Sequence, residues 1–202
     1  TLDRSSAASD VYKRQEYSNS LWFFENTGSA GAPRYEWRTD RFQDIDTAEW
    51  FRFIDLDNDG VIDLLSESPV SRIRHYRNTG TKKAPAFTLV GELRDGTGAP
   101  MFMDRQNIPA LADIDCDGRL DMLVGRVEGV VDRYEATGPG VAQFALIAER
   151  YEGIEIIGGI GMPTTRHGAN ALALGDFDAD GDQDLFWGCL LYTSPSPRDR
   201  TR

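Results

Sequence analysis

One short acidic motif occurs three times in this chain of 202 residues, at residues 55–63, 113–121 and 176–184. Each copy has aspartate at positions one, three, five and nine and glycine at position six. Carboxylates this close together repel one another unless a cation lies between them. Oxygen ligands on a flexible loop suit calcium better than zinc or copper. The motif therefore predicts up to three calcium ions.

The glycine at position six permits a sharp turn that directs the carboxylates at positions one, three and five toward a common centre. Position four lies on the other side of this turn, so the Cys116 side chain is expected to point away from the ion. The predicted carboxylate ligands of these three positions are Asp55, Asp57, Asp59, Asp113, Asp115, Asp117, Asp176, Asp178 and Asp180.

An EF-hand is excluded by two observations. Position twelve of that loop is a bidentate glutamate between two helices, whereas the three copies have Ser66, Val124 and Trp187 there. The flanking segments are also short apolar runs, several of them broken by glycine, which is typical of buried strands. These runs are residues 50–54 and 64–67, 110–114 and 122–125, and 171–174 and 185–188. Each loop is therefore expected to join two strands.

The copies recur about every sixty residues, and such a period with several strands per unit indicates a propeller or a β-solenoid. A second landmark, an aromatic run ending in Asn-Thr-Gly or Ala-Thr-Gly, covers residues 21–28, 73–80 and 131–138. The run reads as a strand, and Asn-Thr-Gly suits a turn whose last residue has a positive φ. Each unit then reads strand, loop, strand, hairpin, strand, turn, strand. We predict an all-β fold, a partial β-propeller of about three four-stranded blades.

These two landmarks together resemble the FG-GAP or VCBS-type repeat, which builds calcium-bearing β-propellers in integrin α chains and in many secreted bacterial proteins. The resemblance covers roughly residues 16–188. It implies that the position-nine carboxylate and the position-seven carbonyl also bind calcium. The position-nine residues are Asp63, Asp121 and Asp184, and the position-seven residues are Val61, Arg119 and Asp182.

The two ends share no pattern with the repeats. Residues 10–15 and 189–194 can be encoded by strings that are reverse complements of each other, offset by one nucleotide, and both resemble translated transposase-type sequencing adapters. We expect residues 1–15 and 189–202 to be non-native tails. The raw nucleotide record tests this expectation.

The segment between the tails divides by its landmarks into four repeats, at about residues 16–48, 49–108, 109–170 and 171–188, the last truncated. Propellers close with about four to eight blades. The expected partners of this segment are therefore the remaining blades of a parent propeller, which would cover its open strand edges.

The formal net charge of −11 reports mainly the acidic loops, which hold a large share of the 33 acidic residues. No Lys/Arg cluster is present to neutralise phosphates, so nucleic acid is not an expected partner. No apolar run approaches the ~20 residues of a membrane helix, so no membrane insertion of this segment is expected.

Aromatic residues of the second landmark, Trp22, Phe23, Phe24, Tyr76 and Tyr134, are expected in blade cores, and His75 is expected as a packed or surface residue of its strand. No Ser/His/Asp or Cys/His arrangement stands out. The sequence therefore favours a calcium-binding repeat of a secreted or cell-surface propeller that acts in adhesion or in recognition of a protein or glycan. The alternative is part of a propeller-fold polysaccharide lyase or hydrolase whose catalytic residues lie in other blades.

Overall fold

The computed structural model describes residues 19–68, 70–104, 107–155 and 170–189. Both predicted tails lie outside these residues except for Cys189, the last residue of a strand. The described residues form strands and two short 3-10 turns, η1 (Phe42–Asp44) and η2 (Tyr151–Gly153). The all-β prediction is thus confirmed. The chain divides after Ala48 into two compact units, which are described separately.

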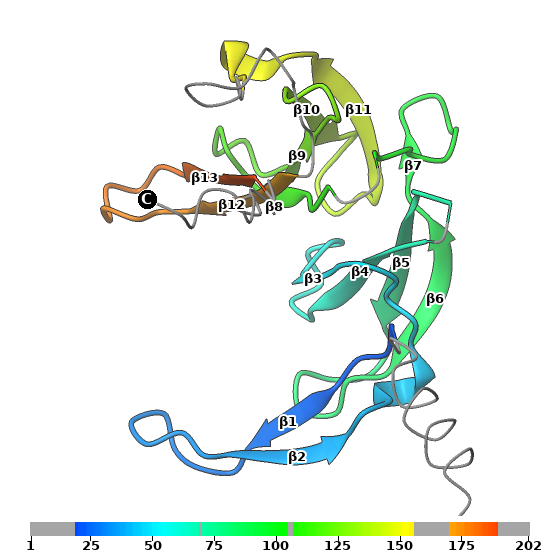
Figure 1. Cartoon of the computed structure of the whole chain (residues 1–202), viewed down its shortest axis with the longest axis vertical. Coiled ribbons are helices and arrows are strands. Elements are labelled where there is room, and N and C mark those ends of the chain that lie inside the picture. Colours follow the sequence, from blue (N-terminus) through cyan, green and yellow to red (C-terminus); the bar gives the residue numbers. More distant parts are fainter. Residues whose placement is uncertain (1–18, 69, 105–106, 156–169, 190–202) are drawn as a thin grey trace, which may run out of the picture. The chain divides into compact units, whose positions relative to one another are not determined.

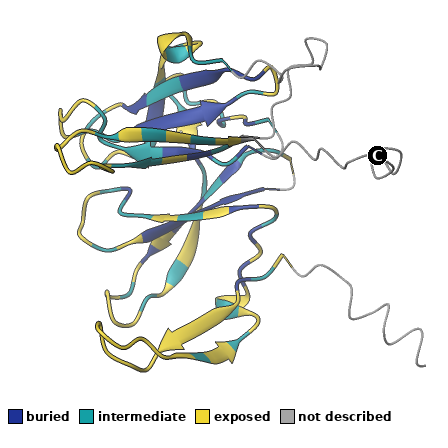
Figure 2. Ribbon diagram, turned by 60° about the vertical axis from the view of Figure 1, so that its left-hand side comes forward, coloured by how far each residue is buried: buried dark blue, intermediate teal, exposed yellow. Residues whose placement is uncertain are grey.

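The first unit contains one antiparallel hairpin of β1 (Phe23–Asn26) and β2 (Tyr35–Thr39). Leu21 and Ile45 are buried beside it. The expectation that the aromatic run is core is wrong here, because Trp22 is 60 %, Phe23 37 % and Phe24 48 % exposed. A two-stranded sheet has too little surface to bury aromatic side chains on both faces, and the hairpin is exposed over most of its length (Figure 2).

The second unit contains two larger sheets (Figure 1). The first is antiparallel, in the order β3-β4-β5-β6. The second has the order β7-β11-β10-β9-β8, in which β7 joins β11 as a parallel edge strand. The strand bounds are β3 (Phe51–Ile54), β4 (Asp63–Glu67), β5 (Ile73–Asn78), β6 (Phe87–Glu92), β7 (Arg94–Asp95), β8 (Ala110–Ala112), β9 (Asp121–Gly125), β10 (Val131–Ala136) and β11 (Gln143–Ala148).

These two sheets confirm the predicted sequence of strand, loop, strand, hairpin, strand, turn and strand. The edge strand β7 was not predicted, because its two residues carry no strand pattern of their own. A third sheet is the hairpin β12 (Asn170–Gly175) and β13 (Asp184–Cys189). Its β12 lies next to the second sheet, since Leu172 N–H donates to the carbonyl of Ile108 at 3.2 Å.

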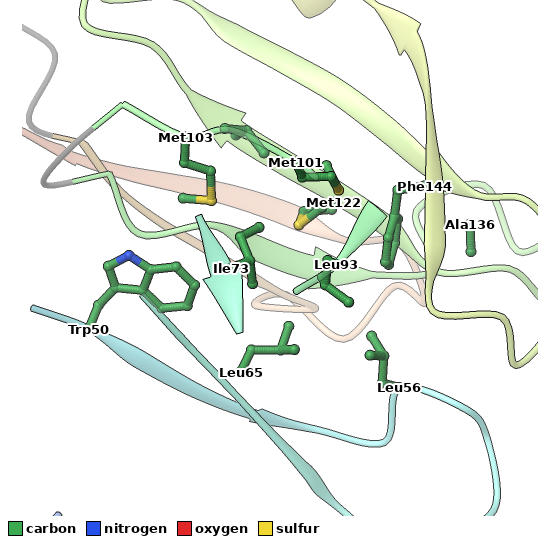
Figure 3. Close-up of a cluster of buried hydrophobic side chains, with 11 residues drawn as sticks. Trp50, Leu56, Leu65, Ile73, Leu93, Met101, Met103, Met122, Ala136 and Phe144 are labelled. Atoms are coloured by element: carbon green, nitrogen blue, oxygen red, sulfur yellow. The ribbon is translucent and has the colours of Figure 1, made fainter. Parts of the chain in front are cut away.

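The main core of the second unit lies between its two larger sheets (Figure 3). Leu65 and Ile73 from the first sheet, with Trp50 just before β3, pack with Met122 and Phe144 from the second. A smaller cluster joins the second sheet to the third hairpin and includes Leu123, Val131 and Leu172.

Strand β9 contributes to both clusters, because alternate side chains of a strand point to opposite faces. Met122 and Val124 face the main core and Leu123 faces the third hairpin. All five residues of β9 are therefore buried. Tyr76 of β5 is also buried, as expected, and Tyr134 of β10 packs against the main core.

The Asn-Thr-Gly turns follow a different rule from the predicted one. Gly28 and Gly80 do not have the positive φ that we expected. Instead, a Cβ on either residue would lie 2.2 Å from a carbonyl oxygen, that of Ala32 or Ala84. Glycine is needed because the chain passes too close for any side chain.

No helix in the described part of the chain has the length and apolar character needed to cross a membrane.

Candidate metal centres

The three acidic loops have the same backbone and each connects the two strands of a hairpin, β3–β4, β8–β9 or β12–β13. In the first loop, the Asp55 carboxylate accepts N–H groups from Asp59 at 3.1 Å and Gly60 at 2.9 Å. Asp113 and Asp176 accept the equivalent pairs of N–H groups in their loops. The position-one carboxylate therefore organises each turn from inside.

Two residues of each loop have a left-handed backbone. Position six was predicted to need this freedom, and its glycines Gly60, Gly118 and Gly181 have φ of 83°, 85° and 100°. Position four has it as well, although only glycine adopts it without strain. The residues there are Asn58, Cys116 and Ala179, with φ of 56°, 60° and 61°. Cys116 is exposed, as expected.

In the first loop, one oxygen of each of Asp55, Asp57 and Asp59 lies within 4.8 Å of the others. Asp57 Oδ1 is buried and has no hydrogen-bond partner, while Asp57 Oδ2 is 2.7 Å from Arg77 Nη2. A buried carboxylate oxygen without a partner is costly unless a cation approaches it. These three carboxylates thus offer the oxygen donors that calcium requires.

The position-nine carboxylate of the first loop, Asp63, lies outside this group of three. Its Oδ1 accepts the N–H of Asn78 at 2.7 Å, and its Oδ2 is 3.0 Å from His75 Nε2. Both Asp63 and His75 are buried. Asp63 therefore anchors the loop to β5, and its role as a calcium ligand stays a prediction.

The second loop brings together Asp113, Asp115 and Asp121, so here the position-nine carboxylate belongs to the group. Asp115 also forms a group with Asp117 and Glu135 of β10. Glu135 was not predicted as a site residue. It adds a fifth carboxylate beside the loop.

Two arginines contact the carboxylates of the second loop. Arg133 lies 2.7 Å from Asp121 Oδ1 through Nε and 2.6 Å from Asp115 Oδ2 through Nη2. Arg119 contacts Asp117 with Nε at 2.7 Å and Glu135 with Nη1 at 2.6 Å. The hydrogen bond from Arg119 lowers the pKa of Asp117, and the bond to Asp121 raises the pKa of Arg133. These contacts therefore favour the charged states of Asp117 and of Arg133.

The third loop is the most exposed of the three. One oxygen of each of Asp176, Asp178 and Asp180 lies within 4.8 Å of the others, and all three residues are exposed. Asp184 accepts the N–H of Phe177 at 3.0 Å. No ion pair is found for these four carboxylates within the described ranges of the chain. Backbone N–H groups of the loop donate to Asp176, Asp180 and Asp184.

The position-seven residues Val61, Arg119 and Asp182 are placed alike. Each donates its backbone N–H to Oδ1 of the position-five aspartate, at 2.8–2.9 Å. The structure shows this role for their amide groups, whereas calcium binding by their carbonyls stays a prediction.

Sequence reasoning missed the basic residue that holds the position-nine carboxylate. His75 follows Asp63 by twelve residues, and Arg133 follows Asp121 by the same number. Both lie on the third strand of their sheet, opposite the middle of the second, where Leu65 pairs with His75 and Leu123 with Arg133. Aligning the repeats by their aspartates would have found this pair. Its residue types differ, so the recurrence is not visible as a motif.

The family model of the FG-GAP-like repeat matches residues 55–124, from the first residue of the first loop to near the end of β9. These residues form an FG-GAP-like repeat. The match begins just after β3, at the first acidic loop, and ends within β9, after the second loop, so it includes strands of both larger sheets. No match was found among the curated proteins or among the solved structures.

Proposed function

We propose that this chain is a calcium-stabilised part of a β-propeller that acts outside the cell in adhesion or ligand recognition. The FG-GAP-like repeat and the two similar larger sheets support the propeller. The observation that carries calcium binding is the first loop, in which three carboxylates converge and the buried Oδ1 of Asp57 lacks a partner. Bound calcium would supply positive charge that neutralises these oxygens and fixes the hairpin.

The ion has a structural role in this proposal, because the loop carboxylates hold turns and no reacting group lies among them. In the first loop, Asp55 would bind the ion while its oxygens keep the N–H groups of Asp59 and Gly60. Calcium sites of extracellular modules often have a dissociation constant of about 0.1–1 mM. Such sites are filled outside the cell, which supports export of the parent protein.

Calorimetric titration of the full chain with calcium tests the metal site. The Asp55→Asn/Asp57→Asn variant should lose the binding of the first loop, and Asp176→Asn/Asp178→Asn that of the third. Glu128→Gln, an exposed acid outside the loops, is the matched control and should bind as the unaltered chain does. Equal binding heats in all of these proteins would refute calcium binding at the loops.

A surface screen of glycans and matrix proteins tests the recognition role. The chain should retain a ligand in the presence of calcium and release it in the presence of a chelator. The lyase or hydrolase alternative predicts instead that the full-length parent cleaves a polysaccharide. Cleavage by the parent would replace recognition with catalysis as the function.

A further inference from the structure

The second loop differs from the other two because its carboxylates already contact positive charge. Arg133 bridges Asp121 and Asp115, and its side chain is only 12 % exposed. Its guanidinium also lies over the Tyr151 ring, 5.6 Å from the centroid. Asp121 is fully buried. The ion pair between Arg133 and Asp121 is therefore enclosed by the sheet, and solvent screens it less than it would screen a surface ion pair.

Arg119 completes the arrangement from the other side of the loop. It contacts Asp117 on the loop and Glu135 on β10. The two guanidinium groups together thus reach Asp115, Asp117, Asp121 and Glu135.

The equivalent positions of the first loop carry different residues. Histidine His75 replaces Arg133 and contacts Asp63. Val61 replaces Arg119, so that side chain brings no charge. Arg77, at the position of Glu135, contacts Asp57 and Asp59, but its side chain is 50 % exposed. The first loop therefore has one solvent-exposed counter-ion, and the second has two that are more enclosed.

A cation at the second loop would share two of its carboxylates with Arg133. Two members of the converging group, Asp115 and Asp121, each accept a short hydrogen bond from Arg133. Bound calcium would lie beside this guanidinium or displace it from a buried partner, and both outcomes are unfavourable. In the first loop the position-nine carboxylate lies outside the converging group and contacts His75 and the Asn78 N–H instead of an arginine.

We propose that Arg119 and Arg133 act as the internal counter-ion of the second loop. They keep this loop folded without a metal ion, so that it binds calcium at least tenfold more weakly than the first loop. The chain then has two kinds of acidic loop, one ion-dependent and one arginine-held. This inference rests on the proposed calcium binding of the first and third loops.

The test isolates the second loop. One variant carries Asp55→Asn, Asp57→Asn, Asp176→Asn and Asp178→Asn, which leaves only the second loop intact. Another is altered at the second and third loops, which leaves only the first intact. Calcium titration of the two variants compares the dissociation constants of the second and first loops. Arg119→Val with Arg133→His then copies the first loop into the second. This double change should strengthen calcium binding at the second loop at least tenfold, which is about 1.4 kcal/mol. Arg77→Met in the first loop is the control, with an expected change below about threefold because Arg77 is half exposed.

Equal affinity of the first and second loops overturns the inference, and so does an unchanged affinity in the double variant. If the double variant does not fold, amide hydrogen exchange of the unaltered chain decides. Chelation should speed exchange of the Gly60 and Gly181 amides at least tenfold and that of Gly118 less than threefold. Equal acceleration at all three glycines overturns the inference alone, whereas no calcium binding at any loop overturns the proposed function as well.

Discussion

The first and second loops have the same turn but different charge environments. In both, the position-one carboxylate accepts two backbone N–H groups, and the position-six glycine has a φ near 85°. In both, the buried position-nine carboxylate accepts a backbone N–H, but its side-chain partner is a histidine in the first and an arginine in the second. The comparison teaches that the motif specifies the backbone of the loop, while residues of the next strand determine how its charge is balanced.

The largest difference should follow removal of the position-nine carboxylate in the presence of a chelator. Asp121→Ala leaves the enclosed Arg133 without its main partner, and we expect a loss of about 3–5 kcal/mol in the free energy of unfolding. Asp63→Ala leaves a histidine and the Asn78 N–H, with an expected loss of about 1–3 kcal/mol. Urea unfolding measures both. Asp184→Ala in the exposed third loop is the control, and equal losses for Asp63 and Asp121 would contradict the comparison.

Asn78, the last residue of β5, supports the first loop in a way that has no counterpart in the second, where the last residue of β10 is Ala136. Its Oδ1 accepts N–H groups of Gly80 and Ala86, and its Nδ2 donates to the carbonyl of Ile62. Asn78→Ala should destabilise the hairpin by about 2–3 kcal/mol, since three partly buried hydrogen bonds are lost together. Amide exchange of the turn measures this loss.

The matched control for Asn78 is Asn26, which makes the same turn bonds on an exposed hairpin. Asn26→Ala should cost about 0.5–1 kcal/mol in local stability. A loss as large as that of Asn78→Ala would show that the tie to the first loop contributes nothing.

The turn glycines give a smaller contrast between the same two repeats. Gly80→Ala would place a Cβ 2.2 Å from the carbonyl oxygen of Ala84, and we expect a cost of about 1–2 kcal/mol from the forced backbone shift. Gly138→Ala meets only a methyl of Val141 at 3.4 Å and should change stability by less than about 0.5 kcal/mol. Thermal unfolding of the two variants provides the comparison, which fails if Gly138→Ala is the more damaging.

The smallest expected effect lies at position four. Asparagine tolerates a left-handed backbone better than cysteine or alanine. Cys116→Asn should therefore stabilise the second loop by about 0.5 kcal/mol, and Asn58→Ala should destabilise the first by a similar amount. Chemical unfolding of the pair, with Asn58→Gly as a control that keeps the backbone freedom, measures the difference. A destabilised Cys116→Asn chain would contradict the assigned strain.

The sequence predicted most of the local fold because its signals are local. The apolar runs on both sides of the first and second loops became β3, β4, β8 and β9, and the position-six glycines have the expected backbone. Edge strand β7 was missed because its position depends on pairing with distant β11. The exposed aromatics of β1 were misjudged because burial depends on what covers a strand rather than on its own pattern.

The charge balance of the loops could not be predicted from the motif alone. His75 and Arg133 reach the position-nine carboxylates only because β5 pairs with β4 and β10 with β9 in a fixed register. Likewise, Gly80 looked like a residue of positive φ, and its true constraint is the nearby carbonyl of Ala84. Both features are contacts between segments, which the residue types of one segment do not encode.

The most direct test is the melting temperature of the full chain measured across a range of free calcium concentrations. An ion that binds only the folded state stabilises it by about 2.7 kcal/mol at a concentration one hundred times its dissociation constant. We predict a melting temperature that rises continuously with calcium and falls again when a chelator is added. A melting temperature that stays the same from chelator to millimolar calcium would contradict the claim that these carboxylates hold a divalent ion.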